Sequence, residues 1–184
     1  MFRLAFRSAF ALGLLLLVGC AGSVPYQYTR QVVYTQTNLH VDDRGAIWST
    51  NYIDGVILPR CTQVTIERVT RKQMNFVVQG TGSKHVYQFH TRSMNEDIPT
   101  HLNRYFAPTC DPAKVETLSE ADKAGIRDGK VYAGMSKAGV ILAVGYPPPH
   151  RTPSLDADTW VYWKTRFGTL EVIFVDGAVQ WLKE

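Results

Sequence analysis

The stretch GMSKAGVILAVGYPPP, residues 134–149, decides the fold of the C-terminal part of the chain. Ser136 is a favoured helix N-cap, and Met135 before it can pack against Val140 inside the helix. Gly145 is a typical residue at a helix C-terminus, and the prolines after it prevent the helix from continuing. The stripe that such a helix would bury consists of Val140, Ile141 and Val144. The stretch therefore predicts a short buried helix between Ser136 and Gly145.

The segments on either side of this helix complete an α+β layer. Upstream, Ser119 can cap a helix that begins at Glu120 and ends near Gly125 or Gly129. Downstream, strands are expected over residues 159–165, 169–175 and 178–182, with Asp176-Gly177 as the turn between the last two. The sequence therefore predicts two helices packed on a three-stranded antiparallel sheet.

Residues 28–91 have the short, alternating apolar runs of a β domain. Strands are expected over residues 31–37, 47–52, 62–69, 74–78 and 86–89. Asp43-Arg44-Gly45 predicts a turn and Asp54-Gly55 predicts a hairpin, so the region indicates a small barrel or sandwich. A helix ended by Ala107-Pro108 is expected next, and its buried face consists of Ile98, Leu102, Tyr105 and Phe106.

A family pattern runs through the C-terminal part of the chain. It consists of Gly134-Met135-Ser136-Lys137, Val140, Gly145-Tyr146-Pro147-Pro148, Asp158-x-Trp160-x-Tyr162, Phe174 and Gly177. Over residues 118–184 this pattern resembles the SmpA/OmlA (BamE-like) family of outer-membrane lipoproteins, which includes a subunit of the barrel-assembly machine. The resemblance implies the same two helices on a three-stranded antiparallel sheet. Because each matched residue has a structural purpose, the pattern indicates a fold more than an activity.

A second pattern lies in the first half of the chain. It consists of Thr50-Asn51-Tyr52, Gly55, Leu58-Pro59 and the strand Val64-x-Ile66, with Cys61 where a glycine is common. Over residues 28–91 it resembles a bacterial SH3-like β-barrel. The barrel-assembly subunit has no such extra β domain. The two resemblances together imply a two-domain relative of the SmpA/OmlA family rather than the assembly subunit itself.

The first twenty residues are typical of an exported lipoprotein. Arg3 and Arg7 precede an apolar run, residues 9–18, that is too short to span a bilayer. Leu17-Val18-Gly19-Cys20 resembles the bacterial lipobox, which implies cleavage before Cys20 and acylation of that cysteine. Ala21 follows where an Asp would imply the inner membrane, so the resemblance implies the periplasmic face of the outer membrane. The alternative is an ordinary signal peptide that contains a cysteine.

These signals divide the chain into four parts. They are a lipoprotein signal peptide (1–19), a lipidated tether (20–27), an SH3-like β domain with a trailing helix (28–115) and a BamE-like α+β domain (116–184). The chain is 45% hydrophobic, which is enough to bury a core, and its net charge of +4 is scattered rather than clustered. We therefore expect a folded, exported protein with no nucleic-acid partner.

Cysteine usage agrees with export. With Cys20 carrying lipid, Cys61 and Cys110 remain, and two thiols in an oxidising compartment favour a disulfide. The alternative is two buried, unpaired thiols. A third role, Cys110 as a nucleophile paired with His85, His90 or His101, is disfavoured because Cys110 lies in a loop rather than at a helix N-terminus.

No other catalytic or metal-binding motif is found in the sequence. There is no G-x-S-x-G, H-E-x-x-H, P-loop or G-x-G-x-x-G pattern. His85 and His90 have no metal-ligand spacing, and Asp156 with Asp158 is better explained by turn formation than by a calcium site. We therefore expect a protein that is not an enzyme and carries neither a cofactor nor a metal ion.

Aromatic residues near the C-terminus are the most plausible functional feature. The last forty residues contain five tryptophans and tyrosines: Tyr146, Trp160, Tyr162, Trp163 and Trp181. Strand alternation requires some of residues 160–163 to face away from the helices, and Trp and Arg are enriched where proteins bind partners. Trp163 and Arg166 are therefore the candidate partner-binding residues.

The expected function is that of a non-enzymatic outer-membrane lipoprotein. It would bind a protein partner, as an assembly or scaffold module of the cell envelope. One alternative is a peptidoglycan- or glycan-binding lipoprotein, which the SH3-like resemblance implies. Another is an inhibitor or regulator of an envelope enzyme, because the layout of two helices on a three-stranded sheet recurs in β-lactamase inhibitor proteins.

Overall fold

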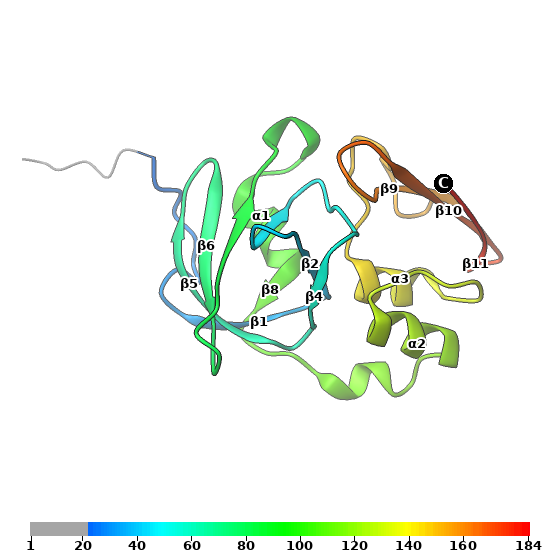
Figure 1. Ribbon diagram of the computed structural model, residues 1–184, viewed down its shortest axis with the longest axis horizontal. Helices are drawn as coiled ribbons and strands as arrows, with labels where there is room; N and C mark the ends of the chain where they lie inside the picture. The colour runs from blue at the N-terminus through cyan, green and yellow to red at the C-terminus, as the bar shows by residue number, and fades with distance from the viewer. Residues whose placement is uncertain (1–21) are drawn as a thin grey trace, which may run out of the picture.

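The computed structural model describes residues 22–184 and shows an α+β fold (Figure 1). Within these residues there are three α-helices and a curled mixed sheet that forms half a barrel, together with a smaller antiparallel sheet. The predicted signal peptide and the lipid on Cys20 lie outside the described residues. None of the helices between residues 22 and 184 is both long enough and apolar enough to cross a membrane.

The larger sheet belongs to the first half of the chain. Its strands, in spatial order, are β3 (Ala46–Trp48), β7 (Lys84–Gln88), β6 (Gln73–Val78), β5 (Gln63–Val69), β1 (Val32–Thr35) and β8 (Phe106–Ala107). All neighbours are antiparallel except β3 and β7, which run parallel. Two more short strands, β2 (Leu39–Val41) and β4 (Val56–Leu58), form a separate antiparallel pair.

The hairpin predicted at Asp54-Gly55 is wrong. Strand β3 before it pairs with β7, and β4 after it pairs with β2, so the two flanking strands do not meet. Gly55 is needed for a different reason: its φ is 131°, and a Cβ there would lie 2.4 Å from the carbonyl oxygen of Val41. The turn predicted at residues 43–45 is confirmed, because the Asp42 carboxylate accepts from the backbone N–H groups of Arg44 and Ala46.

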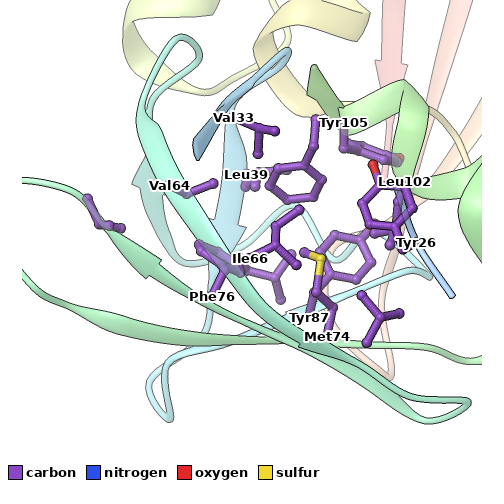
Figure 2. Close-up of a cluster of buried hydrophobic side chains, with 14 of the residues drawn as sticks. Tyr26, Val33, Leu39, Val64, Ile66, Met74, Phe76, Tyr87, Leu102 and Tyr105 are labelled. Carbon is purple, nitrogen blue, oxygen red and sulfur yellow. The ribbon is translucent and has the colours of Figure 1, made fainter. Parts of the chain in front are cut away.

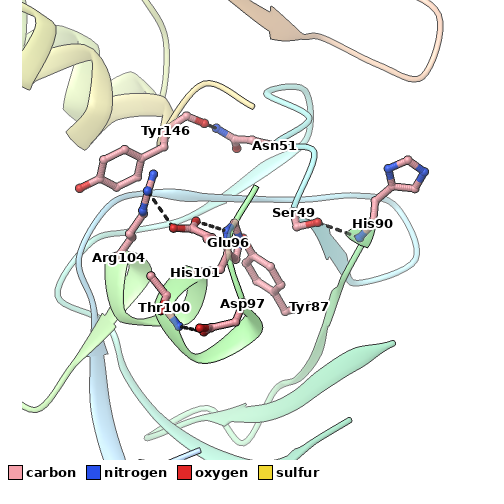
Figure 3. Close-up of polar contacts among 10 residues, drawn as sticks. All are labelled: Ser49, Asn51, Tyr87, His90, Glu96, Asp97, Thr100, His101, Arg104 and Tyr146. Atoms are coloured by element: carbon pink, nitrogen blue, oxygen red, sulfur yellow. Dashed lines mark hydrogen bonds and ion pairs between the residues drawn. The ribbon is translucent and has the colours of Figure 1, made fainter. Parts of the chain in front are cut away.

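The concave face of this sheet holds the first hydrophobic core (Figure 2). Strict alternation supplies it, since Val64 and Ile66 of β5 and Met74 and Phe76 of β6 are fully buried. Helix α1 (Ile98–Tyr105) packs Leu102 and other apolar side chains into the same core. The helix begins where the Asp97 side chain accepts from the N–H of Thr100 at 2.7 Å (Figure 3).

Residues 23–26 lie against the larger sheet. The backbone N–H of Val24 donates to the carbonyl of Val69 at 2.9 Å, and Ser23 forms an isolated bridge with Thr70. Tyr26 is buried, and its hydroxyl donates to Asn103. The segment expected as a tether, residues 20–27, is therefore in contact with the sheet from Ser23 onward.

The second half has the elements that its sequence predicts. Helix α2 (Glu120–Asp128) is capped by Ser119 and ends at Gly129, whose φ is +62°. Helix α3 (Lys137–Val144) is capped by Ser136 and followed by Gly145. The antiparallel sheet has the order β11 (Ala178–Lys183), β10 (Thr169–Val175), β9 (Thr159–Trp163).

A second hydrophobic core lies between these helices and one face of the small sheet. Trp160 and Tyr162 of β9 are fully buried, as the alternation in β9 predicts. Met135 and Val140 belong to the same buried cluster, in agreement with the predicted packing around the start of α3. The short 3₁₀ helices Thr91–Ser93 and Pro112–Val115 lie in the connections of the first half and between the halves.

The two halves are joined where helices α2 and α3 end. The side-chain amide of Asn38 donates to the carbonyls of Ile126 and Ala143, at 2.6 and 3.2 Å. Nε2 of His40 donates to the carbonyl of Gly129 at 3.0 Å. These carbonyls have no partner within their own helices, so side chains from the first half complete the C-termini of the second.

A disulfide joins Cys61 and Cys110, with their Cα atoms 5.3 Å apart. It connects the loop before β5 to the segment after β8. The predicted pairing is present in the structure. Arg60 donates to the backbone carbonyl of Asp111 beside the bond at 2.8 Å, so the two loops are held by polar contacts as well.

Candidate functional site

A cleft of about 140 Å³ lies where the two halves meet, and we call it the junction cleft. Its lining residues come from both halves and are Trp48, Thr50, Tyr52, His90, Ser93, His150, Trp163 and Arg166. The candidate residues Trp163 and Arg166 therefore lie together in one cleft. They meet six residues from three other segments of the chain.

Strand alternation aims the two tryptophans at the cleft. Ile47 of β3 is buried in the first core, so its neighbour Trp48 faces the other side of the sheet. Tyr162 of β9 is buried in the second core, and Trp163 faces away from it for the same reason. Both tryptophans are half-buried, which leaves part of each ring at the cleft surface.

Trp163 is held in place by several contacts. Its indole N–H donates to Nε2 of His150 at 3.2 Å, and the two rings stack with centroids 6.3 Å apart. The guanidinium of Arg151 lies 5.5 Å from the ring centroid. The backbone carbonyl of Trp163 accepts from the N–H of Ile53 at 2.9 Å, which links β9 to the first half. The ring is therefore largely pre-positioned.

Trp48 and Tyr52 form the opposite wall. Their ring centroids are 5.9 Å apart. The indole N–H of Trp48 donates to the carboxylate of Asp42 at 3.1 Å, which orients the ring. Hydrogen bonds from Ala46, Trp48 and Arg44 outweigh the desolvation of Asp42 and hold the pKa of its carboxyl below the usual value, so it stays ionised as an acceptor.

The polar groups of the cleft include one with no partner. Thr50 is only 6% exposed, and no hydrogen bond to its hydroxyl is found among residues 22–184. By contrast, Ser93 bonds to Nδ1 of His90, and the backbone N–H of His90 donates to Ser49 at 2.8 Å (Figure 3). A buried hydroxyl without a partner is unusual, and a bound ligand is one way to supply its partner.

The charge of the cleft has one sign. No carboxylate lines it, whereas the cationic Arg166 does, together with two histidines, His90 and His150. Burial lowers the pKa of His150, and the nearby charges of Arg151 and His90 lower it further. A hydrogen bond to the backbone carbonyl of Ser93 acts in the opposite direction and raises it. The cleft therefore suits a ligand with an apolar face and an acceptor or acidic group.

A wider groove of about 960 Å³ continues from the cleft and shares Trp48, Tyr52 and Arg166 with it. Its floor is the outer face of β3 and β7, and the loop between β9 and β10 forms one side. Its rim carries charges of both signs, namely Asp42, Asp43, Arg44, Asp54, Lys164 and Arg166. Cleft and groove together form an extended depression with aromatic residues at its centre.

A buried polar cluster behind the first core resembles a catalytic relay in its connectivity. His101 contacts the Tyr87 hydroxyl through Nε2 at 2.9 Å and Glu96 through Nδ1 at 3.1 Å, and Arg104 pairs with Glu96 at 2.8 Å (Figure 3). Hydrogen bonding from His101, followed by the charge of Arg104, lowers the pKa of Glu96. Tyr87 and His101 are 1% and 5% exposed, so the Tyr87–His101 pair is buried, and the cluster stabilises α1 against the sheet.

The remaining sequence candidates lie elsewhere. The sulfur of Cys110 is bonded to Cys61, and His85 packs against Phe76. Among residues 22–184 no group of three or more His, Cys, Asp or Glu side chains is placed to hold a metal ion. Asp156 serves a turn in which its N–H donates to Ser154.

Sequence reasoning singled out Trp163 and Arg166 as candidates, and both line the junction cleft, but it did not indicate the lining residues of the first half. Trp48 carries a usable signal, because it alternates with the buried Ile47 in a short strand. His90 and His150 carry none, since each comes from a loop whose position depends on the whole fold. No family model, curated protein or solved structure matches this chain.

Proposed function

We propose that this protein is a non-enzymatic, lipid-anchored protein of the bacterial outer membrane that binds a protein partner in the periplasm. The junction cleft and the adjoining groove are its binding site. The observation that carries the proposal is the meeting of Trp48, Tyr52, Trp163 and Arg166 at one depression between the two halves. Trp, Tyr and Arg are the residues that contribute most to binding at protein interfaces.

The charges around the groove favour a protein segment over an acidic polymer. Protein interfaces combine an aromatic centre with a polar, charged rim, as this depression does. Asp43 and Asp54 on the rim would repel an anionic glycan, whereas Arg44 and Arg166 lie on the same rim. A peptide segment can carry both signs and so complement both kinds of charge.

The fold relationships belong to the same proposal. In this proposal, helices α2 and α3 with β9–β11 correspond to the SmpA/OmlA layout, and the curled sheet of the first half corresponds to an SH3-like barrel. We assign the chain to this two-domain arrangement. Lipid on Cys20 would place it at the periplasmic face of the outer membrane.

Photo-crosslinking in intact cells tests the partner. A photoreactive residue at position 166 should give a discrete protein adduct, because Arg166 is exposed and lines both cleft and groove. The same residue at position 116, which is exposed in the connection between the halves, is the matched control. Absence of any adduct above that control would reject the protein partner. Mass spectrometry of the N-terminal peptide of the mature chain tests the anchor, and a Cys20 without acyl chains would reject it.

Glycan binding is the second candidate, and the exposed aromatic rings of the cleft favour it. Sugar rings present C–H faces that pack on Trp and Tyr side chains in apolar pockets. The measurement is retention of the mature chain on purified peptidoglycan. Retention that is lost in both Trp48→Ala and Trp163→Ala, without a protein adduct from position 166, would replace the first proposal with this one.

A further inference from the structure

The chain enters the fold beside the turn between β5 and β6. Ser23 is bridged to Thr70, and the N–H of Val24 donates to the carbonyl of Val69 at 2.9 Å. Figure 1 shows this entry on the side of the molecule away from the C-terminal half. Two residues, Ala21 and Gly22, separate Cys20 from Ser23 in the sequence, and the three Cα–Cα steps between them span at most about 11 Å. A lipid on Cys20 would therefore hold this turn close to the membrane surface.

The same turn carries a cluster of basic side chains, which we call the basic turn. It consists of Arg68, Arg71 and Lys72, all exposed, with the exposed Arg30 beside them. Arg30 is placed there by a hydrogen bond from its backbone N–H to the carbonyl of Ile66 at 2.6 Å. No ion pair within residues 22–184 joins any of the four to a carboxylate.

We propose that the basic turn binds the headgroups of anionic phospholipids and holds the protein on the membrane as a second anchor beside the lipid. This inference rests on the proposed acylation of Cys20, which brings the turn to the surface. Electrostatic attraction extends over a Debye length of about 8 Å in physiological salt, comparable to the reach of the chain between Cys20 and Ser23. Glu67 is the one carboxylate within this run of β5, and the basic side chains outnumber it.

The attraction has an expected size. Each Lys or Arg close to an anionic membrane strengthens binding by about fivefold. Stable attachment generally combines acyl chains with a polybasic patch, because each signal alone is weaker. With the turn on the membrane, the C-terminal half lies on the far side of the first half, as Figure 1 shows. That half, with its side of the groove, would then project toward the periplasm.

Vesicle binding of the chain without its lipid isolates this contribution. The probe is a set of vesicles of phosphatidylcholine alone or with increasing phosphatidylglycerol, and the protein is residues 20–184 with Cys20→Ser. Binding should rise with the phosphatidylglycerol fraction and fall with added salt. Arg71→Gln/Lys72→Gln should weaken it by roughly 25-fold, since two charges are removed. The matched control is Lys114→Gln/Lys130→Gln, which removes two exposed charges far from the turn.

Three outcomes would overturn the inference. The first is equal binding to vesicles with and without phosphatidylglycerol, and the second is an equal loss of binding in the two double variants. The third is full competition by free glycerol phosphate at the concentration of the vesicle headgroups, because it would indicate a site for a soluble phosphate. Because this protein carries no acyl chain, the result does not depend on the processing of Cys20 or on a partner. If Cys20 of the wild type proves not to be acylated while vesicle binding follows the expected pattern, the proposed anchor is rejected and the basic turn stands.

Discussion

The side-chain amide of Asn51 donates to the carbonyl oxygen of Val144, 2.7 Å away, where helix α3 ends. The same amide donates to the carbonyl of Tyr146 at 2.8 Å (Figure 3). Asn51 also adopts a φ of 53°, a left-handed conformation that Asn tolerates better than most residues. One residue of the first half therefore satisfies two carbonyls of the second.

Asn51→Ala should destabilise the protein by about 2–4 kcal/mol, because it leaves these carbonyls without a donor and places alanine in a strained conformation. Asn51→Gly loses the same hydrogen bonds without the strain, so it should be less destabilising by about 1 kcal/mol. Urea unfolding measures both free energies. Equal losses in the two variants would show that backbone strain contributes nothing here.

Gly139 of α3 is required by the buried carboxylate of Asp122. A Cβ at position 139 would lie 1.8 Å from Oδ1 of Asp122, which accepts from the N–H of Ser136 at 2.8 Å. Gly139→Ala should therefore cost about 1–3 kcal/mol, even though alanine favours helices. Gly168→Ala is the control: its nearest atom is 3.9 Å away, so its effect should stay within about 0.5 kcal/mol. The idea fails if chemical denaturation shows both variants to be equally stable.

A substitution at Thr50 tests ligand binding at the junction cleft without an expected loss of stability. Its buried hydroxyl has no hydrogen-bond partner among the described residues, so Thr50→Val removes a desolvated polar group without breaking a contact. The variant should be as stable as the wild type or more stable. Capture of the partner from position 166 should fall, because the hydroxyl would no longer be available to a ligand. Unchanged capture in the Thr50→Val background would mean that the hydroxyl plays no part in binding.

The sequence predicts local features of this fold well and its long-range contacts poorly. The caps at Ser119, Ser136 and Gly145 lie within a few residues of the helices they bound, so neighbouring residues suffice to identify them. Asn38 and Asn51 bond to residues about ninety positions further along the chain, and no local pattern indicates such a pair. The parallel pairing of β3 with β7 was missed for the same reason.

The candidate site shows the same division. Trp163 follows from alternation in a single strand, whereas the junction cleft exists only because four separate segments converge. Gly55 shows how a local signal can mislead: Asp-Gly is a good hairpin turn, but here the glycine permits close approach to Val41. Turn chemistry and close packing both select glycine, and the sequence alone does not distinguish them.

The Cys61–Cys110 disulfide closes a span of 49 residues that includes most of the larger sheet. Because a cross-link lowers the entropy of the unfolded chain, its removal should cost up to roughly 4 kcal/mol. The Cys61→Ala/Cys110→Ala variant should unfold at lower urea concentration than the oxidised wild type, and reduction of the wild type should reproduce the shift. Mass spectrometry under non-reducing conditions checks the bond, and two free thiols in freshly exported protein would contradict it.

His40 should make stability depend on pH in a window that opens at pH 6.5 and extends down to its lowered pKa in the folded protein. Burial lowers the pKa of His40 below 6.5. The hydrogen bond to the carbonyl of Gly129 and the charge of Asp54 both raise this pKa and offset part of the effect of burial. As pH falls through 6.5, the unfolded chain gains a proton at this position while the folded protein remains neutral, so the free energy of unfolding decreases. The carboxylates with lowered pKa, such as Asp42, titrate below this window.

His40→Gln keeps an amide donor for the Gly129 carbonyl and removes the titrating group. It should flatten the pH dependence of the free energy of unfolding in this window, even if the amide reaches Gly129 less well and the variant is less stable throughout. His150→Gln is the control, because the pKa of His150 is also lowered. His150 is exposed, so its removal should flatten the pH dependence of the free energy of unfolding less than His40→Gln does. Urea unfolding at a series of pH values measures the slope. Parallel curves for the wild type and His40→Gln would show that His40 is not the group responsible, and a larger change in His150→Gln would assign the pH dependence to the junction cleft instead.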